Sequence, residues 1–184
     1  MKELIILAGA NGSGKTTLAN SILKENDLFF LNADEIEKTL EQSEKSPLRA
    51  GRIFFEKLDK IFTEQKSFIL ETTLSGNYLE NVIKKAKKLN YTIVMYFVFL
   101  DSSQLCIERI KTRVENGGHH VPDEDVKRRF YRGKENFWNT YVNKVDRWAL
   151  YYNANSGMYI EVAKGNSKSY VPLNEDLFNQ FIKL

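Results

Sequence analysis

The sequence contains a single cysteine, Cys106, among its 184 residues. An intrachain disulfide is therefore impossible, and a cysteine-rich zinc site is excluded because such a site needs several thiolates. Cys106 falls on the same helical face as Ile110, so we expect it to lie in the core rather than to act as a nucleophile.

Long apolar runs are also missing. The longest, residues 93–100, is interrupted by Tyr96 and falls far short of the roughly 18 residues that a membrane-spanning helix needs. The amino terminus passes at once from a short apolar stretch into a glycine-rich polar one, unlike a secretion signal. We therefore expect a protein of the reducing cytoplasm with no membrane partner.

Neither sign of charge dominates the chain. Lys and Arg number 27 and Asp and Glu number 24, which gives a formal net charge of +3. This balance permits contact with a polyanion without indicating one, so nucleic acid is not the partner that we expect. The length and the 42% hydrophobic content predict a single domain over residues 1–184.

Short apolar runs alternate with longer amphipathic stretches, which is typical of an α/β domain with a mainly parallel sheet. We predict five strands, near residues 4–8, 28–32, 68–71, 92–100 and 158–163. Helices are expected from residue 15, over 34–42, 48–65, 79–89 and 102–115, from Pro122 onward, and over 173–184. Ser102 or Ser103 is a plausible cap for the helix that ends at residue 115.

One motif follows the first predicted strand directly. Residues 9–16 match the pattern G-x-x-x-x-G-K-[ST] and consist of Gly9, Ala10, Asn11, Gly12, Ser13, Gly14, Lys15 and Thr16, with Thr17 next in the chain. Glycines let the backbone approach a phosphate closely, and a helix amino terminus adds partial positive charge. The motif therefore predicts a phosphate-binding loop (P-loop) in which Lys15 contacts the β- and γ-phosphates and the Thr16 hydroxyl binds Mg²⁺.

Three acidic residues follow predicted strands, at the edge where parallel sheets bind ligands. Asp34 is either a base for an acceptor hydroxyl or a helix cap, and the sequence does not decide between them. Glu71 is followed by Thr72 and Thr73. A carboxylate beside two hydroxyl groups is suited to bind an acceptor or a metal-bound water, and the alternative is a polar residue that only ends a strand. Asp101 is either a helix cap or a contact to nucleotide or metal.

Five arginines lie around a segment that runs from Gly117 to Pro122, and they are Arg109, Arg113, Arg128, Arg129 and Arg132. Guanidinium groups neutralise a transferring phosphoryl group well, so residues 109–132 are predicted to form a lid over ATP. We expect Arg113 and Arg129 to contact phosphate, whereas a solvated basic face explains Arg128 and Arg132 equally well. His119 either bridges the lid to the substrate or lies exposed.

Several motifs together resemble those of the zeta-toxin-type P-loop kinases. They are residues 9–16, 32–34, 71–76, 113–122 with 128–129, and 148–153. The resemblance implies an adenylate-kinase-like three-layer sandwich with an arginine-bearing lid. It also implies phosphorylation of a small-molecule hydroxyl by ATP and Mg²⁺. Toxin members of the family phosphorylate UDP-N-acetylglucosamine.

By this resemblance, Lys15 and Thr16 bind phosphate and Mg²⁺, Asp34 is the base, and Arg113 and Arg129 clamp ATP. Glu71 and Thr72 line the acceptor side, with Thr73 and His119 beside them. Asp34, Glu71 or Asp101 would assist Thr16 in holding the metal through water. The sequence contains no recognisable segment for contact with an antitoxin.

A small-molecule kinase is accordingly our leading hypothesis. Two other hypotheses stay open at this point. One is a kinase of nucleic-acid ends, and the other is a nucleotide-binding switch that hydrolyses ATP slowly.

Overall fold

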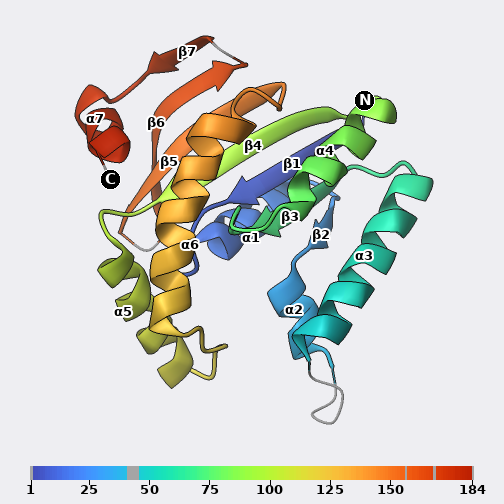
Figure 1. Cartoon of the computed structure of the whole chain (residues 1–184), viewed down its shortest axis with the longest axis horizontal. Coiled ribbons are helices and arrows are strands. Elements are labelled where there is room, and N and C mark those ends of the chain that lie inside the picture. The colour runs from blue at the N-terminus through green and yellow to red at the C-terminus, as the bar shows by residue number, and fades with distance from the viewer. Residues whose placement is uncertain (1, 41–45, 156, 168, 184) are drawn as a thin grey trace.

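A computed structural model describes residues 2–40, 46–155, 157–167 and 169–183 (Figure 1). The strands are β1 (Glu3–Ala8), β2 (Phe29–Leu31), β3 (Phe68–Thr72), β4 (Thr92–Phe99), β5 (Arg147–Asn155), β6 (Met158–Asn166) and β7 (Ser169–Pro172). The helices are α1 (Lys15–Glu25), α2 (Ala33–Lys38), α3 (Pro47–Thr63), α4 (Tyr78–Lys88), α5 (Ser103–Glu115), α6 (Asp123–Asn136) and α7 (Glu175–Lys183). A π-helical turn, Phe137–Tyr141, follows α6 directly.

All the strands form one sheet in the order β2-β3-β1-β4-β5-β6-β7. The strands from β2 to β5 pair in parallel, and β6 and β7 extend the sheet antiparallel. The predicted α/β fold with a mainly parallel sheet is confirmed, but the predicted number of five strands is wrong, because the sheet has seven. The prediction missed β5, which is nine residues long, and β7, which is only four residues long.

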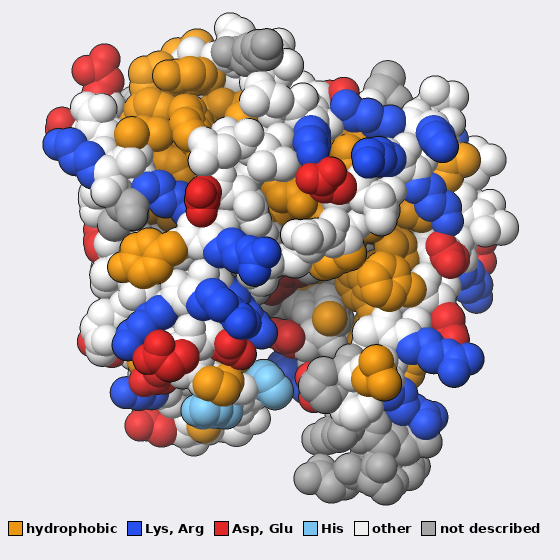
Figure 2. Space-filling view, viewed as in Figure 1, with side chains coloured by type: hydrophobic (Ala, Val, Ile, Leu, Met, Phe, Trp, Pro, Cys, Tyr) orange, Lys and Arg blue, Asp and Glu red, His pale blue; other side chains and the backbone are white. Residues whose placement is uncertain are grey.

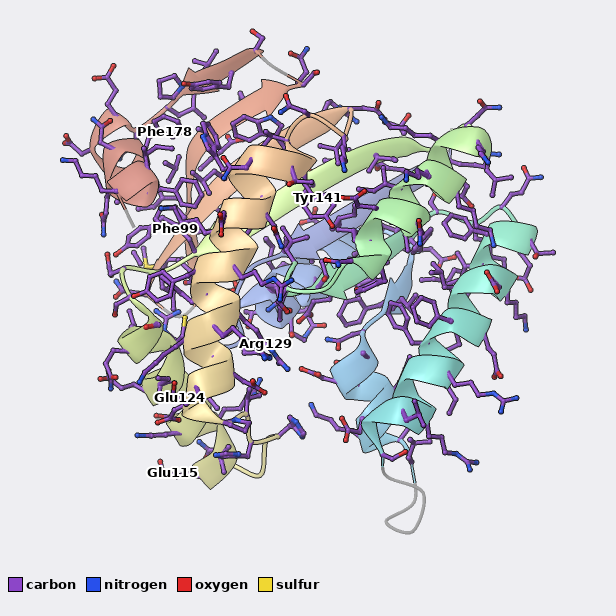
Figure 3. All side chains as sticks on the ribbon, in the orientation of Figure 1. Phe99, Glu115, Glu124, Arg129, Tyr141 and Phe178 are labelled. Carbon is purple, nitrogen blue, oxygen red and sulfur yellow. The ribbon has the colours of Figure 1, made fainter. Side chains whose placement is uncertain are left out.

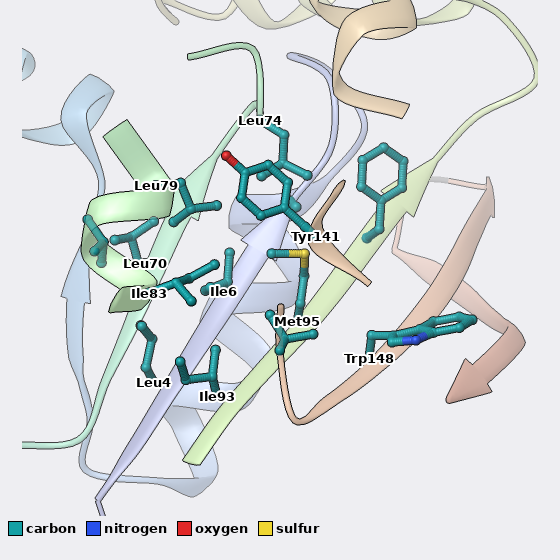
Figure 4. Packing of buried hydrophobic residues seen from close by; sticks show 14 of the residues in the cluster. Leu4, Ile6, Leu70, Leu74, Leu79, Ile83, Ile93, Met95, Tyr141 and Trp148 are labelled. Atoms are coloured by element: carbon teal, nitrogen blue, oxygen red, sulfur yellow. The ribbon is translucent and has the colours of Figure 1, made fainter. Parts of the chain in front are cut away.

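Side chains of alternate strand residues cover opposite faces of the sheet. On one face Leu4 and Ile6 belong to the largest core cluster, which α3, α4, the π-helical turn and α7 complete. Figure 4 shows Ile6 of β1 and Leu70 of β3 meeting Ile83 of α4 on this face. On the other face Ile5 packs with residues of α1. The sheet is thus the middle layer of three.

The predicted helices are present, with corrections at their ends. Ser102 caps α5, since its hydroxyl accepts a hydrogen bond from the Leu105 amide at 3.2 Å. Asn32, and not Asp34, caps α2, and α2 ends at Lys38. The last two residues of the predicted helix 34–42 lie outside the described residues. None of the helices in the described part of the chain is long and apolar enough to cross a membrane.

Phe137 offers a test of how the π-helical turn is packed. Its ring is fully buried and stacks on Phe97 with centroids 4.6 Å apart. Phe137→Ala should lower the free energy of unfolding by about 3–5 kcal/mol, because it leaves a cavity between two layers. Urea denaturation measures this loss. Tyr131→Ala, at a 54% exposed position of α6, should change it by no more than about 0.5 kcal/mol.

Cys106 is fully buried between α5 and α6, as the sequence predicted. Burial raises the pKa of its thiol to about 11, against the lowering effect of the Lys15 and Arg109 charges. The reactive thiolate is therefore scarce at pH 8. We expect iodoacetamide to label the native protein at pH 8 far more slowly than the urea-unfolded protein, as followed by mass spectrometry. Equal rates would contradict this packing.

Candidate functional site

The P-loop lies between the end of β1 and the start of α1. Gly12 and Gly14 have φ angles of 81° and 102°, in the left-handed region that favours glycine. A Cβ at Gly12 would lie 2.5 Å from the carbonyl oxygen of Cys106, so a larger residue would also collide there. No side chain caps α1, which leaves its first amide groups available to an anion.

A first cavity of about 320 Å³ opens in front of this loop. Its lining consists of Asn11, Gly12, Gly14, Lys15, Thr16, Thr17, Asn32, Asp34, Glu35, Lys38, Glu71, Arg109, Arg113, His119, Asn153 and Gly157. Four of these side chains are cationic at neutral pH, two from the lid and one each from α1 and α2. The chemistry of this cavity is that of a polyphosphate site.

Glu71 stands at the end of β3, where the register places it beside Leu7 of β1. Its carboxylate accepts a hydrogen bond from the Thr16 hydroxyl at 2.9 Å. It also lies 3.7 Å from the Lys15 ammonium group, which is itself 5% exposed and donates to the Ala10 carbonyl oxygen at 2.9 Å. Glu71 therefore orients both side chains that the motif assigns to phosphate and metal.

The donor set fits Mg²⁺ in one particular way. No group of three or more His, Cys, Asp or Glu side chains within the described residues could hold a metal ion. The Thr16 hydroxyl and the Glu71 carboxylate do converge, however. Because Mg²⁺ commonly takes few protein ligands and fills its shell with water and substrate phosphates, these two oxygen groups suit it.

A second cavity of about 250 Å³ adjoins the first. It is lined by Asn11, Lys15, Asn32, Ala33, Asp34, Glu71, Thr72, Thr73, Ser75, Gly76, Tyr78 and Arg129. Hydroxyl and amide groups predominate, and burial raises the pKa of Tyr78 to about 12, although the Thr72 hydroxyl lowers it in part. Tyr78 therefore stays a protonated hydrogen-bond donor at neutral pH.

Asp34 and Glu71 line both cavities, so they stand where the two meet. The Asn32 side chain takes the capping position, accepting from the Asp34 amide at 2.8 Å. This geometry excludes the cap that the sequence allowed for Asp34. No side chain within the described residues donates to the Asp34 carboxylate, which leaves it available to a ligand.

The two arginines expected to clamp ATP lie at different cavities. Arg113 lines the first cavity and donates to the His119 carbonyl oxygen at 2.7 Å. Arg129 lines the second cavity and donates to Asn11 Oδ1 at 3.0 Å. Figure 3 shows Arg129 reaching from α6 toward the centre of the molecule. The structure therefore brings Arg129 to the P-loop from the side of the second cavity.

The lid as a whole borders a hollow on one face of the molecule. Figure 2 shows this hollow between the α5–α6 side and the α2–α3 side, with Lys and Arg side chains gathered along the former. Arg128 and Arg132 are exposed and line neither cavity, and Arg128 pairs with Asp125 at 2.8 Å. Of the two roles that the sequence left open for Arg128 and Arg132, their exposure favours a solvated basic face.

Some other predicted positions lie elsewhere. Thr72 and Thr73 line the second cavity, whereas His119 lines only the first. Gly9, Ala10 and Ser13 shape the P-loop without lining either cavity. Asp101 is away from the site and caps no helix, because its carboxylate accepts from Tyr152 at 2.8 Å and from Gln180 at 2.6 Å. Asp101 lines neither cavity, so the structure does not place it with the other predicted metal or nucleotide contacts.

Several residues that line the cavities were not predicted from the sequence, and Arg109, Asn32 and Asn153 are three of them. Arg109 was grouped with the lid but given no role, and it lines the first cavity. Asn32 lines both cavities, and its place directly after a strand was a usable signal. Asn153 lines the first cavity from β5, and no local pattern around it indicates a function.

Known proteins resemble this chain in sequence and in fold. An uncharacterised protein of Haemophilus influenzae is 28% identical over 130 residues, which are 70% of this chain and 92% of that protein. Among solved structures, a chain of the AvrRxo1-ORF1:AvrRxo1-ORF2 complex with ATP aligns over 98% of this chain, with a TM-score of 0.78 and 17% identity. Our chain spans 63% of the length of that matched chain.

Two further structures share the fold at similar identities. A chain of the PezAT toxin–antitoxin system of Streptococcus pneumoniae aligns over 100% of this chain and 85% of its own length, with a TM-score of 0.64 and 15% identity. A putative kinase from Chloroflexus aurantiacus aligns over 72% of this chain and 80% of its own length, with a TM-score of 0.55 and 20% identity. Identities this low show a common fold, which is of the P-loop NTPase type.

The family itself is shown by the sequence. Residues 4–132 match the family model AAA_33, described as an AAA domain. The match covers well over half of the chain and includes the P-loop, α2, Glu71 and the lid arginines. The chain therefore belongs to the AAA_33 family of AAA domains.

Proposed function

We propose that the protein is an ATP-dependent phosphotransferase that moves the γ-phosphoryl group of ATP to a hydroxyl of a small-molecule acceptor. The observation that carries this proposal is that the first and second cavities share Lys15, Asp34 and Glu71. A phosphoryl group held at the P-loop would thus face a molecule in the second cavity. Phosphoryl transfer depends mainly on such positioning and on charge stabilisation.

The cationic groups of the first cavity would stabilise the transferring charge. Lys15 is nearly buried, where a charge interacts more strongly than in water. Arg109 and Arg113 approach from α5, and guanidinium groups bind phosphate oxygens in pairs. Mg²⁺, when bound, would neutralise phosphate charge, and the Thr16 hydroxyl and the Glu71 carboxylate are the groups that would hold it.

Asp34 is the residue that we assign as the base. Its carboxylate lines both cavities and has no donor within the described residues, whereas Glu71 is engaged by Thr16 and Lys15. Asp34 would accept a hydrogen bond from the acceptor hydroxyl, orient its oxygen toward the phosphoryl group and take its proton during transfer.

The acceptor and partner follow from the resemblance to zeta-toxin-type kinases. That resemblance makes a nucleotide sugar such as UDP-N-acetylglucosamine the first acceptor to test, and the hydroxyl and amide lining of the second cavity suits a polyhydroxylated molecule. Fold neighbours were solved as parts of the PezAT toxin–antitoxin system and the ORF1:ORF2 complex. A protein partner of this chain is therefore a second proposal.

The decisive experiment is incubation with γ-labelled ATP, Mg²⁺ and a metabolite pool that includes UDP-sugars, followed by identification of the labelled product. A labelled small molecule supports the kinase. Release of phosphate alone would indicate a nucleotide-hydrolysing switch instead. Label on added RNA or DNA ends would indicate a kinase of nucleic-acid ends.

Lys15→Ala should abolish transfer and weaken ATP binding by about 10- to 100-fold, the effect of losing a charge-assisted hydrogen bond to phosphate. Calorimetric titration with ATP and the labelling assay measure the two effects. Lys24→Ala removes an exposed lysine from the same helix and should change neither. ATP binding by Lys15→Ala at the wild-type level would exclude the phosphate role of the loop.

Asp34→Asn should lower kcat by about 10²–10⁴, the range for a lost general base, and leave the Kd for ATP unchanged. Glu37→Gln, on the same helix but in neither cavity, is the matched control. If Asp34→Asn keeps wild-type turnover while Glu71→Gln loses it, Glu71 takes the role of the base.

A further inference from the structure

The β5–β6 hairpin contacts the P-loop from the far end of the sequence. Asn153 Nδ2 of β5 donates to the carbonyl oxygen of Ser13 at 2.9 Å. The Tyr159 hydroxyl of β6 donates to the carbonyl oxygen of Gly14 at 2.7 Å. Both residues lie beyond the region 4–132 that the family model matches, and neither belongs to a phosphate-binding motif.

These two bonds fix the direction of two amide groups. In a trans peptide unit the carbonyl of one residue and the N–H of the next point in opposite directions. A bond to the Ser13 carbonyl therefore sets the direction of the Gly14 N–H, and a bond to the Gly14 carbonyl sets that of the Lys15 N–H. Gly14 and Lys15 both line the first cavity, and their amides are among the donors that a P-loop offers to phosphate.

The Asn153 side chain is itself held in one orientation. It is 1% exposed, and its Oδ1 accepts from the Gly157 amide at 3.3 Å. Because the amide oxygen is used there, the amide nitrogen is the group that faces Ser13. That nitrogen also fills the space that a Cβ of Gly14 would need. The contact is therefore matched in shape as well as in hydrogen bonding.

The lid helix joins the same network. Arg109 of α5 lines the first cavity and donates to the backbone carbonyl of Asn153 at 3.2 Å. Burial raises the pKa of Tyr159, although the Thr17 hydroxyl and the Arg109 charge lower it in part. The Tyr159 hydroxyl is thus a protonated donor at neutral pH. Hairpin, loop and lid helix are connected through hydrogen bonds in this one place.

We infer that Asn153 and Tyr159 are positioning residues of the nucleotide site, which hold the P-loop amides in the orientation that binds a polyphosphate. The inference rests on the proposed nucleotide binding and adds to it a part of the site that lies outside the motif. Fixing donors before the ligand arrives raises affinity because less freedom is lost on binding.

The test compares two hairpin variants with a matched control. Tyr159→Phe removes one hydroxyl, and Asn153→Asp replaces the donor to Ser13 while keeping an acceptor for Gly157. Tyr152→Phe is the matched control. It removes a hydroxyl of the same hairpin, but this hydroxyl donates to Asp101, which lines neither cavity. Calorimetry at 20 °C measures the Kd for ATP and for inorganic tripolyphosphate, and thermal melting reports stability.

We expect Tyr159→Phe to weaken both ligands by about three- to tenfold, the effect of one hydrogen bond, and Asn153→Asp by tenfold or more. An equal loss of affinity for ATP and for tripolyphosphate would show that the variants weaken the contacts to phosphate, because tripolyphosphate has no nucleoside. Tyr152→Phe should bind both ligands as the wild type does.

Two contrary outcomes are distinguishable. If the wild type binds ATP and both hairpin variants bind it equally well, with only their melting temperatures lowered, the hairpin merely supports the fold and the inference is overturned. If the wild type itself binds no ATP, the proposed function fails, and this inference fails with it. Should Asn153→Asp not fold, Tyr159→Phe decides alone.

Discussion

The carboxylate of Glu71 joins the two side chains on which phosphate chemistry at this site depends. It accepts from the Thr16 hydroxyl and lies 3.7 Å from the Lys15 ammonium group, and both charged groups are nearly buried. A buried ammonium group without a counter-charge would be strongly destabilising. Glu71 reaches this place because β3 runs parallel to β1 in a register that sets Glu71 beside Leu7, two residues before the loop begins at Gly9. The register of β3 against β1 therefore determines whether Glu71 can reach Lys15 and Thr16.

From this junction the site divides into two chemically different halves. The first cavity collects cationic side chains from α1, α2 and α5, whereas the second collects hydroxyl groups from β3 and the segment that follows it, together with the amides of Asn11 and Asn32. Arg129 is the one arginine of the second cavity, and its bond to Asn11 ties it to the P-loop. The two halves of the site thus differ in charge and in hydrogen-bonding groups, with the Asp34 carboxylate at the boundary.

Local patterns in the sequence predicted the parts of this site that local chemistry determines. The motif around Lys15 identified the loop, and the pattern of residues 102–115 predicted a cap at Ser102 or Ser103, of which Ser102 is the cap. The sequence left Asp34 as either a base or the cap of α2, because Asp is a common capping residue, and it did not indicate Asn32, which takes the cap in the structure. The contact between Asn153 and Ser13 spans 140 residues, and pairings over such distances leave no periodicity to detect.

The part of the chain that matches the family model depends on later residues for several of its contacts. It ends at residue 132, before β5, which pairs with β4 from Val94 to Phe99. Without β5, β4 would be an open edge, and Phe97 would lose its stacking partner Phe137. The Ser13 carbonyl oxygen would lose its donor as well. Closing the sheet and shaping the P-loop thus require the same C-terminal segment, which explains why the loop motif alone does not define the site.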